Sequence, residues 1–297
     1  MTYTPPEPRL QMSKTILLTG ANRGIGFATA KKLLEAGHRV IATARTQDKA
    51  DAAVGALRRA VRGAEVEGRA VELASQASIR ALAGGIHDDE LRLDVLVHNA
   101  GMLFSSPRQQ RNADGVEMVL FVNAVAPWLL TRLLVDAIRR PGRVVALGSS
   151  LHRPGRRGAG VDFRFGDPHM DAHYHPDRAY KNSKLALLWV MRQLDHRLQN
   201  DGIRCDVISP GFVPTTAAEG VTGLKRFFLS KVLPLMPFST SLEDSATNLA
   251  RLVGDDALDD GGGRYFQHWA AVPPSDDALD DDKARRFWDL AEQWVTL

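Results

Sequence analysis

A glycine-rich turn lies between the first apolar stretch and the first helical stretch of this chain, and it constrains the fold more than any other feature. Residues 14–19 form a short apolar run, and residues 20–26 read Gly-Ala-Asn-Arg-Gly-Ile-Gly. A helical pattern follows over 25–36 and ends before Gly37. Backbone N–H groups at such a helix start bind anions, and glycines let a phosphate approach the backbone. The arrangement predicts a first β-α-β unit that binds a nucleotide.

Strand-like and helix-like stretches alternate along the rest of the chain. Further strands are predicted at 39–44, 70–73, 93–98, 143–147, 203–209 and 263–266, and helices at 49–62, 78–82, 116–138, 178–198, 241–253 and 283–295. Continuous apolar runs such as 93–98 are typical of parallel sheets that helices cover on both faces. Because no linker divides the chain, the sequence predicts one α/β domain over residues 13–297, preceded by a flexible tail at 1–12.

Composition and charge exclude several classes of protein. The formal net charge of +3 over 297 residues is far from the concentrated basic surface of a nucleic-acid binder. The one cysteine, Cys205, cannot form an intramolecular disulfide. The proline-rich start lacks the pattern of a signal peptide, and no run approaches the ~18 consecutive apolar residues of a membrane span. We therefore expect a cytoplasmic protein that has no membrane span and binds no nucleic acid.

Six motifs resemble those of the short-chain dehydrogenase/reductase family and follow in the same order. They are TGxxxGIG at 19–26, His98-Asn99-Ala100-Gly101 in place of NNAG, Asn123 in the long helix, Ser149-Ser150 after the fifth strand, YxxSK at 180–184, and Pro210-Gly211. The resemblance covers residues 13–215 and implies a doubly wound Rossmann-type sheet of about seven strands in the order 3-2-1-4-5-6-7. It also implies a homodimer or homotetramer, because family members usually pair through the two long helices.

The end of the second predicted strand indicates which nicotinamide cofactor the chain binds. An NAD-binding chain places Asp or Glu there to hold the ribose hydroxyls, whereas this strand ends in Thr43-Ala44-Arg45. Arg23 and Arg45 can both reach a 2′-phosphate, so the sequence favours NADP(H) over NAD; two solvated surface arginines are the alternative. By resemblance, Glu72 stands where the family has an Asp beside the adenine, and Asn99 supports the central strand. The residues expected to hold NADP(H) are Gly20, Asn22, Arg23, Gly24, Ile25, Gly26, Arg45, Glu72, Leu73, Asn99, Ala100, Gly101, Tyr180, Lys184, Pro210, Gly211, Val213 and Thr215.

Tyr180 and Lys184 are four residues apart on a predicted helix, so both side chains lie on one face. A nearby ammonium favours the phenolate and would lower the pKa of the tyrosine. The resemblance implies that Tyr180 is the general acid or base, that Lys184 lowers its pKa and holds the nicotinamide ribose, and that Asn123 sustains a proton relay. It also implies a serine on the substrate oxygen. Ser150 is the expected one, because Ser149 matches the family's preceding, non-catalytic serine.

Two segments depart from the simplest members of the family. An insert at about 152–177 separates Ser150 from Tyr180 and contains Arg153, Arg156 and Arg157 as well as four histidines. Its His173-x-His175 pair is not expected to bind metal, because loop histidines lack a fixed scaffold. The insert resembles that of the retinol-dehydrogenase-like branch. A second segment, at about 212–238, is rich in Phe, Leu and Pro and is expected to form a substrate lid.

The motifs favour an NADP(H)-dependent oxidoreductase that transfers a hydride between the nicotinamide and a carbonyl or alcohol. An apolar lid would suit a bulky hydrophobic small molecule, although core packing or a dimer contact explains the same residues equally well, and a membrane-surface role is a third hypothesis. Two other functions stay open: a reductase of a C=C or C=N bond on the same fold, and a non-catalytic NADP(H)-binding sensor. Four intact catalytic motif residues argue against the sensor.

Overall fold

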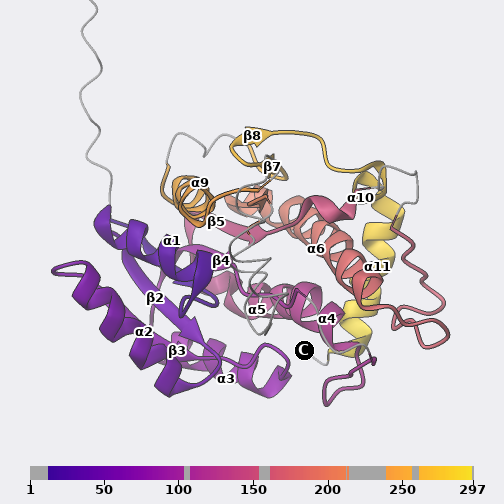
Figure 1. Ribbon diagram of the computed structural model, residues 1–297, viewed down its shortest axis with the longest axis horizontal. Helices are drawn as coiled ribbons and strands as arrows, with labels where there is room; N and C mark the ends of the chain where they lie inside the picture. Colours follow the sequence, from indigo (N-terminus) through magenta and orange to yellow (C-terminus); the bar gives the residue numbers. More distant parts are fainter. Residues whose placement is uncertain are drawn as a thin grey trace, which may run out of the picture.

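The fold is built on one sheet, and the order of its strands can be compared directly with the predicted order. In the computed structural model, which describes residues 13–103, 108–153, 161–211, 213, 239–255 and 261–295, one sheet has the order β3-β2-β1-β4-β5-β6-β7-β8 (Figure 1). The strands are β1 (Thr15–Leu18), β2 (Arg39–Ala44), β3 (Val66–Ala70), β4 (Leu93–His98), β5 (Ile138–Leu147), β6 (Ile203–Ser209), β7 (Tyr265–Gln267) and β8 (Ala270–Ala271). All neighbours are parallel except β7 and β8. The predicted order 3-2-1-4-5-6-7 is confirmed, with one short antiparallel strand added at the edge.

Helices cover both faces of this sheet. They are α1 (Gly24–Glu35), α2 (Gln47–Ala60), α3 (Gln76–Asp88), α4 (Met118–Leu120), α5 (Ala126–Leu134), α6 (Pro176–Leu198), α9 (Leu242–Gly254), α10 (Asp276–Leu279) and α11 (Asp281–Trp294). Short helical turns lie at η1 (Phe121–Val125), η2 (Val135–Ala137), η3 (Ser150–His152) and η4 (Gln199–Asp201). Helices α1, α2 and α9 cover one face, and α3, α5 and α6 cover the other (Figure 1).

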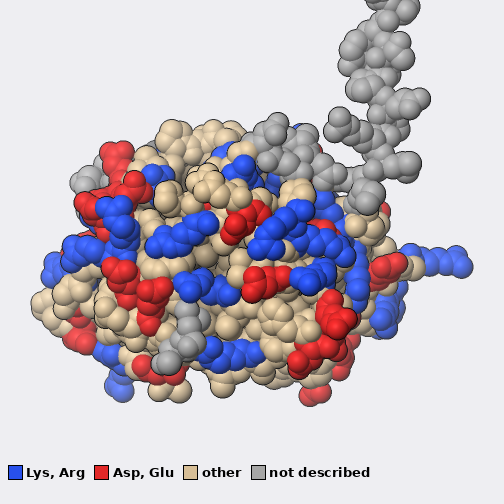
Figure 2. Space-filling view, turned by 180° about the vertical axis from the view of Figure 1, so that it is seen from behind, with Lys and Arg blue, Asp and Glu red and all other residues tan. Residues whose placement is uncertain are grey.

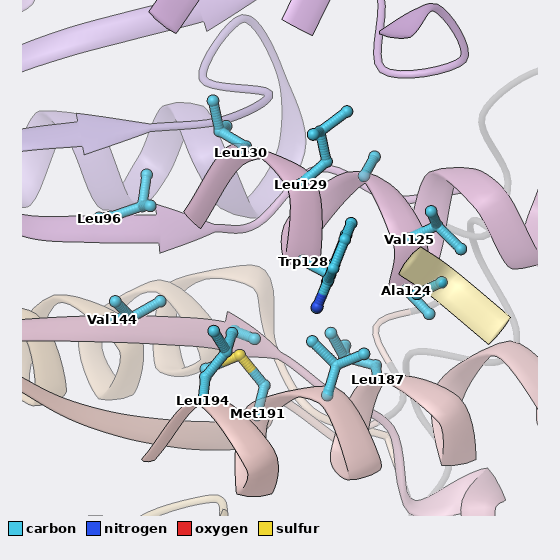
Figure 3. Packing of buried hydrophobic residues seen from close by; sticks show 14 of the residues in the cluster. Leu96, Ala124, Val125, Trp128, Leu129, Leu130, Val144, Leu187, Met191 and Leu194 are labelled. Carbon is cyan, nitrogen blue, oxygen red and sulfur yellow. The ribbon is translucent and has the colours of Figure 1, made fainter. Parts of the chain in front are cut away.

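Alternate residues of the central strands enter two different cores, because successive side chains of a strand point to opposite faces. In β1, Ile16 and Leu18 pack beneath α1 and α9, while Leu17 packs beneath α3 and α5. Figure 3 shows the second core, in which Trp128 of α5 lies together with Leu96 and Val144 of the sheet and with Leu187 and Met191 of α6. Apolar residues on both faces of each strand account for the continuous runs in the sequence.

The third strand lies earlier than the sequence predicts. It spans Val66–Ala70, in register with β2, and the predicted strand residues 71–73 instead follow its carboxyl end. Pairing with β2 decides the register, because β3 is an edge strand with little apolar pattern of its own. The following helix, α3, is also longer than predicted, since Ser75 caps its start and it continues through Gly84 and Gly85 despite their low helix propensity.

The predicted helix 116–138 is one helical stretch interrupted by the π-helical turn η1. By length and composition the stretch Met118–Ala137 is apolar enough to cross a membrane, yet 78% of its most apolar window is buried inside the fold. A helix at the centre of a soluble core passes the same test. The insertion of a π turn at Phe121–Val125 shifts the helix face that follows and turns Asn123 toward the end of β4.

The C-terminal helix α11 packs along α6 and reaches α5 (Figure 1). Trp288 meets the edge of the Trp128 ring at 5.5 Å between centroids, and the Arg197 guanidinium lies 4.0 Å above the Trp288 ring. Helix α11 therefore covers part of the surface of α5 and α6, which belong to the two long helices through which the formation of a dimer or tetramer was predicted.

Candidate active site

The glycine turn after β1 is held against the end of β4. The Asn99 side chain donates to the Thr19 carbonyl at 2.8 Å, and the Thr19 hydroxyl accepts from the backbone N–H of Asn99 at 3.0 Å. A Cβ on Gly26 would lie 2.2 Å from the Gly20 carbonyl oxygen, and Gly20 itself has a φ of 70°. Only glycine fits these two positions. Asn99 thus fixes the turn to the central strand.

The start of α1 leaves backbone donors for an anion. Arg23 occupies the N-cap position and makes no capping hydrogen bond through its side chain, and the first turn carries no acidic residue. An uncapped helix start combines free N–H groups with a partial positive charge. The glycines keep side chains out of its approach. These features fit the pyrophosphate of a dinucleotide.

A cavity of about 710 Å³ lies in front of this turn. Twelve of the predicted cofactor residues line it: Gly20, Asn22, Arg23, Gly24, Ile25, Gly26, Arg45, Glu72, Leu73, Asn99, Ala100 and Gly101. The lining also includes residues that the sequence analysis did not select, among them Lys49, Met102, Gln110, Met118 and Leu147. The cavity runs along the carboxyl ends of the parallel strands, where open α/β sheets bind their ligands.

Basic side chains gather at one end of the cavity. Arg45 follows β2 and pairs with Glu72 through Nε at 2.9 Å, and two-thirds of the Arg45 side chain stays exposed. Lys49 in the first turn of α2 lines the same end. The Lys49 ammonium is thus a further cation, besides Arg45, that an anionic ligand in this cavity can meet. The ion pair keeps the Glu72 carboxylate beside Arg45 in the lining of the cavity.

Asn123 connects the loop after β4 to α6. Its Oδ1 accepts from the Met102 N–H at 2.8 Å, and its Nδ2 donates to the Met102 carbonyl and to the Ser183 hydroxyl, both at 2.9 Å. The Ser183 hydroxyl in turn donates to the Tyr180 carbonyl at 2.7 Å. The buried amide is therefore fully engaged in fixing the backbone around the site.

Tyr180 and Lys184 lie together on α6, and both side chains are buried. The Lys184 ammonium donates to the Leu147 carbonyl at 2.8 Å and lies 5.8 Å from the centre of the Tyr180 ring. Burial raises the pKa of Tyr180 to about 12 and lowers the pKa of Lys184 to about 8. Burial disfavours the charged form of both groups, so the pKa of Tyr180 lies above its ordinary value although Lys184 is adjacent. The effect of Lys184 on the pKa of Tyr180 stays a prediction.

The serine that hydrogen-bonds the Tyr180 side chain is Ser149. This bond opposes the effect of burial on the pKa of Tyr180. Ser149 lies immediately after Gly148 at the end of β5, whereas Ser150, the predicted residue, begins the next helical turn, η3. The hydrogen bond to Tyr180 favours Ser149 over the expected Ser150, and the identity of the serine that contacts the substrate oxygen stays a prediction.

The remaining cofactor residues follow β6. The Ser245 hydroxyl of α9 donates to the Pro210 carbonyl at 3.0 Å. Gly211 has a φ of 82°, and a Cβ there would lie 2.0 Å from the Thr240 hydroxyl, so glycine is required. Val213 is buried under α9. The predicted Thr215 and nearly all of the predicted lid at 212–238 lie outside the residues that the structure describes.

The described part of the insert packs against the loop before α4. The Gln109 side chain donates to the His169 carbonyl and to the Asp171 carboxylate, and Arg111 pairs with Asp171. Phe163 packs against Trp189 and Phe287. Within the described ranges, no three His, Cys, Asp or Glu side chains come together as a metal site would require.

A cavity along the carboxyl ends of a parallel sheet, a glycine turn at the start of α1 and a buried Tyr180–Lys184 pair together define a class of protein, a Rossmann-type oxidoreductase. A family model described as short chain dehydrogenase matches residues 14–160, and one described as Enoyl-(Acyl carrier protein) reductase matches residues 169–257. The chain belongs to the short-chain dehydrogenase/reductase family, in its retinol-dehydrogenase-like branch.

Named relatives and solved structures are similar to this chain over most of its length. Retinol dehydrogenase 14 of Homo sapiens is 34% identical over 98% of this chain and 89% of its own length, and retinol dehydrogenase 13 of Homo sapiens is 33% identical over 96% and 85%. The angucycline C-6 ketoreductase LanV with bound NADP is 25% identical over 87% of this chain and 95% of that chain, with a TM-score of 0.68. A blue fluorescent protein from a metagenomic library in complex with NADPH is 26% identical over 87% and 98%, with a TM-score of 0.66.

Proposed function

We propose that this oxidoreductase uses NADP(H) and transfers a hydride between the nicotinamide and a carbonyl or alcohol carbon, with Tyr180 as the general acid or base. The observation that carries the proposal is the buried Tyr180 side chain, hydrogen-bonded to Ser149 and adjacent to Lys184. The NADP(H) contained in both solved relatives agrees with Arg23, Arg45 and Lys49 at the end of the cavity. A cluster of cations favours a 2′-phosphate over a free ribose hydroxyl.

Each protein group has a separate task in this mechanism. The bound cofactor supplies or accepts the hydride. The uncapped start of α1 holds the pyrophosphate, and Arg45 and Lys49 hold the 2′-phosphate. Ser149 donates a hydrogen bond to the substrate oxygen, and Tyr180 gives that oxygen a proton during reduction or removes one during oxidation. Lys184 stabilises the negative charge that Tyr180 acquires and binds the nicotinamide ribose.

Burial of Tyr180 favours the direction of reduction at neutral pH. A general acid must carry its proton before the reaction, and a pKa raised to about 12 keeps the phenol protonated. Oxidation needs the phenolate and so becomes faster as the pH rises. The Lys184 ammonium, with a pKa lowered to about 8, is present below that pH and stabilises the phenolate formed in each turnover.

The proposed substrate is a bulky apolar molecule. The Tyr180 ring packs with Val119 and Met170, and Met102, Leu103 and Tyr174 lie partly buried against the same cluster. These side chains offer an apolar surface beside the proton donor, which binds hydrocarbon more strongly than polar groups. Two relatives are named retinol dehydrogenases, and retinol is an apolar alcohol.

No concentrated basic surface competes with this proposal on the face that Figure 2 presents. Lys and Arg side chains there alternate with Asp and Glu. Mixed charge of this kind does not attract a polyanion such as nucleic acid. The charges on this face therefore agree with the proposal of a small-molecule substrate.

The test measures oxidation of NADPH and of NADH with a panel of bulky ketones, aldehydes and quinones, with Tyr180→Phe measured alongside. We expect turnover with NADPH in the wild type and a loss of about 10³-fold or more in the variant, with NADPH affinity retained. Enones and imines belong in the panel, because one matching family model is described as an enoyl reductase. Turnover that survives in Tyr180→Phe would contradict the catalytic assignment. Tight NADPH binding without turnover on the extended panel would favour a sensor.

A further inference from the structure

His152 belongs to the insert and has no part in the mechanism above, yet it is fully buried. It is the last residue of the turn η3, three residues after Ser149. Its imidazole ring meets the edge of the Tyr265 ring of β7 at 4.9 Å between centroids. A histidine in a solvated insert would be exposed. The burial of this one requires a partner for each ring nitrogen.

Both nitrogens have such partners, and the partners determine the protonation state. Nδ1 lies 2.6 Å from the Ser149 carbonyl oxygen, which can only accept, so Nδ1 carries a proton. Nε2 lies 3.2 Å from the backbone nitrogen of Ser275, which can only donate, so Nε2 is bare. The contacts are satisfied by a single species, the neutral ring with its proton on Nδ1.

These two bonds join the active-site serine to a distant part of the chain. Ser275 is the N-cap of α10 and follows the edge strands β7 and β8. Ser149 accepts from the Leu151 N–H through its hydroxyl at 3.2 Å and also hydrogen-bonds Tyr180. The carbonyl held by His152 and the hydroxyl that meets Tyr180 belong to the same residue. Fixing the first restricts the orientation of the second.

We propose that His152 is a positioning residue for the reaction: its neutral Nδ1–H form holds the Ser149 carbonyl against the edge of the sheet and thereby aims the Ser149 hydroxyl at the reacting oxygen. The inference rests on the proposed function for its effect on rate. It extends that function, because it gives the insert a task in catalysis through His152. Protonation of the ring would place an N–H against the Ser275 N–H and break the connection.

The surroundings keep His152 neutral. Burial lowers its pKa, and the Arg153 guanidinium lowers it further, while the Ser149 carbonyl acts in the opposite direction. The charged and titratable groups around the ring in the described chain are Arg153 and Tyr265, whose own side chains lie together with 5.7 Å from the guanidinium carbon to the ring centre. Because the folded-state pKa is lowered, the connection is intact at neutral pH and is lost only on acidification below the ordinary histidine range.

The first experiment reads the tautomer without any turnover. Histidine labelled with ¹⁵N in the ring is followed by long-range ¹H–¹⁵N NMR from neutral to acidic pH, and the signals of His152, one of nine histidines, are assigned from their absence in His152→Asn. We expect a protonated Nδ1, a bare Nε2 and no titration in the ordinary histidine range. An Nε2–H tautomer, or an ordinary pKa, would overturn the proposal even if the enzyme is active.

The second experiment uses three substitutions that separate the two ring nitrogens. His152→Asn retains a donor near the position of Nδ1, His152→Gln reaches only the position of Nε2, and His152→Phe retains the ring against Tyr265 without either bond. We expect kcat to fall about 10- to 100-fold in the Phe and Gln variants and no more than about threefold in the Asn variant, with the Kd for NADPH unchanged in all three.

NADPH affinity reports that each variant has folded, and it does not depend on Ser149. Wild-type kcat in His152→Phe, or equal losses in His152→Phe and His152→Asn, would overturn the proposal. If His152→Phe fails to bind NADPH, the proposal is tested instead by comparing kcat of His152→Gln with kcat of His152→Asn. A wild type that turns over no substrate, together with the expected tautomer, would instead count against the proposed function alone.

Discussion

A difference of one residue decides which hydroxyl faces the tyrosine. Ser149 follows an extended strand end and its side chain reaches Tyr180, while Ser150 has already entered a helical turn. We expect Ser149→Ala to lower kcat about 10²- to 10³-fold, as removal of a donor to a reacting oxygen does in other enzymes. Ser150→Ala is the matched control and should stay near wild-type activity. The opposite ranking, measured as kcat with NADPH, would restore the assignment made from sequence.

The buried tyrosine predicts opposite pH dependences for the two directions of the reaction. Carbonyl reduction needs protonated Tyr180, whose pKa burial raises to about 12, so its rate should show no loss from tyrosine ionisation between pH 6 and 8, on the order of four units below that pKa. Alcohol oxidation needs the phenolate and should become faster as the pH rises from 6 to about 8, above which the Lys184 ammonium that stabilises the phenolate is lost. Initial rates in both directions on one substrate pair check this. An oxidation rate that falls between pH 6 and 8 would contradict the burial argument.

His98, which replaces an asparagine of the family motif, predicts a stability effect. Its Nε2 lies 2.8 Å from the Thr131 hydroxyl, and burial lowers its pKa to about 3. The unfolded chain binds a proton below the ordinary pKa and the folded chain does not. The free energy of unfolding therefore decreases by about 1.4 kcal/mol per pH unit as the pH falls from about 6.5 toward 3. Urea unfolding from pH 7 to 5 should show this loss in the wild type, and the loss should be smaller in His98→Asn, which retains the buried His152.

At the scale of elements, two helical glycines differ in what surrounds them. Gly26 in α1 faces the Gly20 carbonyl and the Asn99 side chain, whereas no atom lies within 4 Å of a Cβ placed on Gly84 in α3. Gly26→Ala should cost about 1–3 kcal/mol in unfolding free energy and abolish NADPH binding. Gly84→Ala should instead stabilise the chain by about 0.5–1 kcal/mol, because alanine favours the helix. NADPH titration and thermal unfolding of both variants test the contrast; unchanged cofactor binding in Gly26→Ala would contradict it.

At the scale of the whole molecule, α11 determines how copies of the chain can associate. Its buried residues Phe287 and Trp288 join the core formed by α5 and α6, so this surface is not available to a partner without displacing the helix. We expect sedimentation to show a monomer, or an oligomer formed through another surface. Hydrogen exchange at low and high protein concentration distinguishes these cases. Concentration-dependent protection of α5 and α6 would contradict the prediction.

The same helix should contribute strongly to stability. Trp288 combines the edge contact with Trp128, the overlying Arg197 guanidinium and a hydrogen bond from its indole nitrogen to Glu292 at 2.9 Å. Trp288→Ala should lower the free energy of unfolding by about 3–5 kcal/mol, as large-to-small substitutions in a core do. Arg285→Ala on an exposed part of α11 is the matched control, with a change of less than about 0.5 kcal/mol. Chemical unfolding measures both.

The features predictable from sequence depend on short stretches of chain. The turn at Gly20 and Gly26 needs glycine for local backbone reasons, and apolar runs such as Leu93–His98 predict buried parallel strands by themselves. The i, i+4 spacing of Tyr180 and Lys184 places them on one helix face wherever that helix lies. The order of the strands, in contrast, was implied by the resemblance to the family that the motifs carry, and the structure confirms it.

Other features depend on contacts between residues far apart in the chain, which local patterns do not encode. Pairing with β2 decides where β3 begins, and packing around α6 buries Tyr180 deeply enough to raise its pKa when a neighbouring lysine predicted a fall. The backbone at the end of β5 directs Ser149 rather than Ser150 toward the site. The position of α11 on α5 and α6 follows from the whole core. Such outcomes arise from the sum of many distant contacts and from desolvation, and both exist only once the chain has folded.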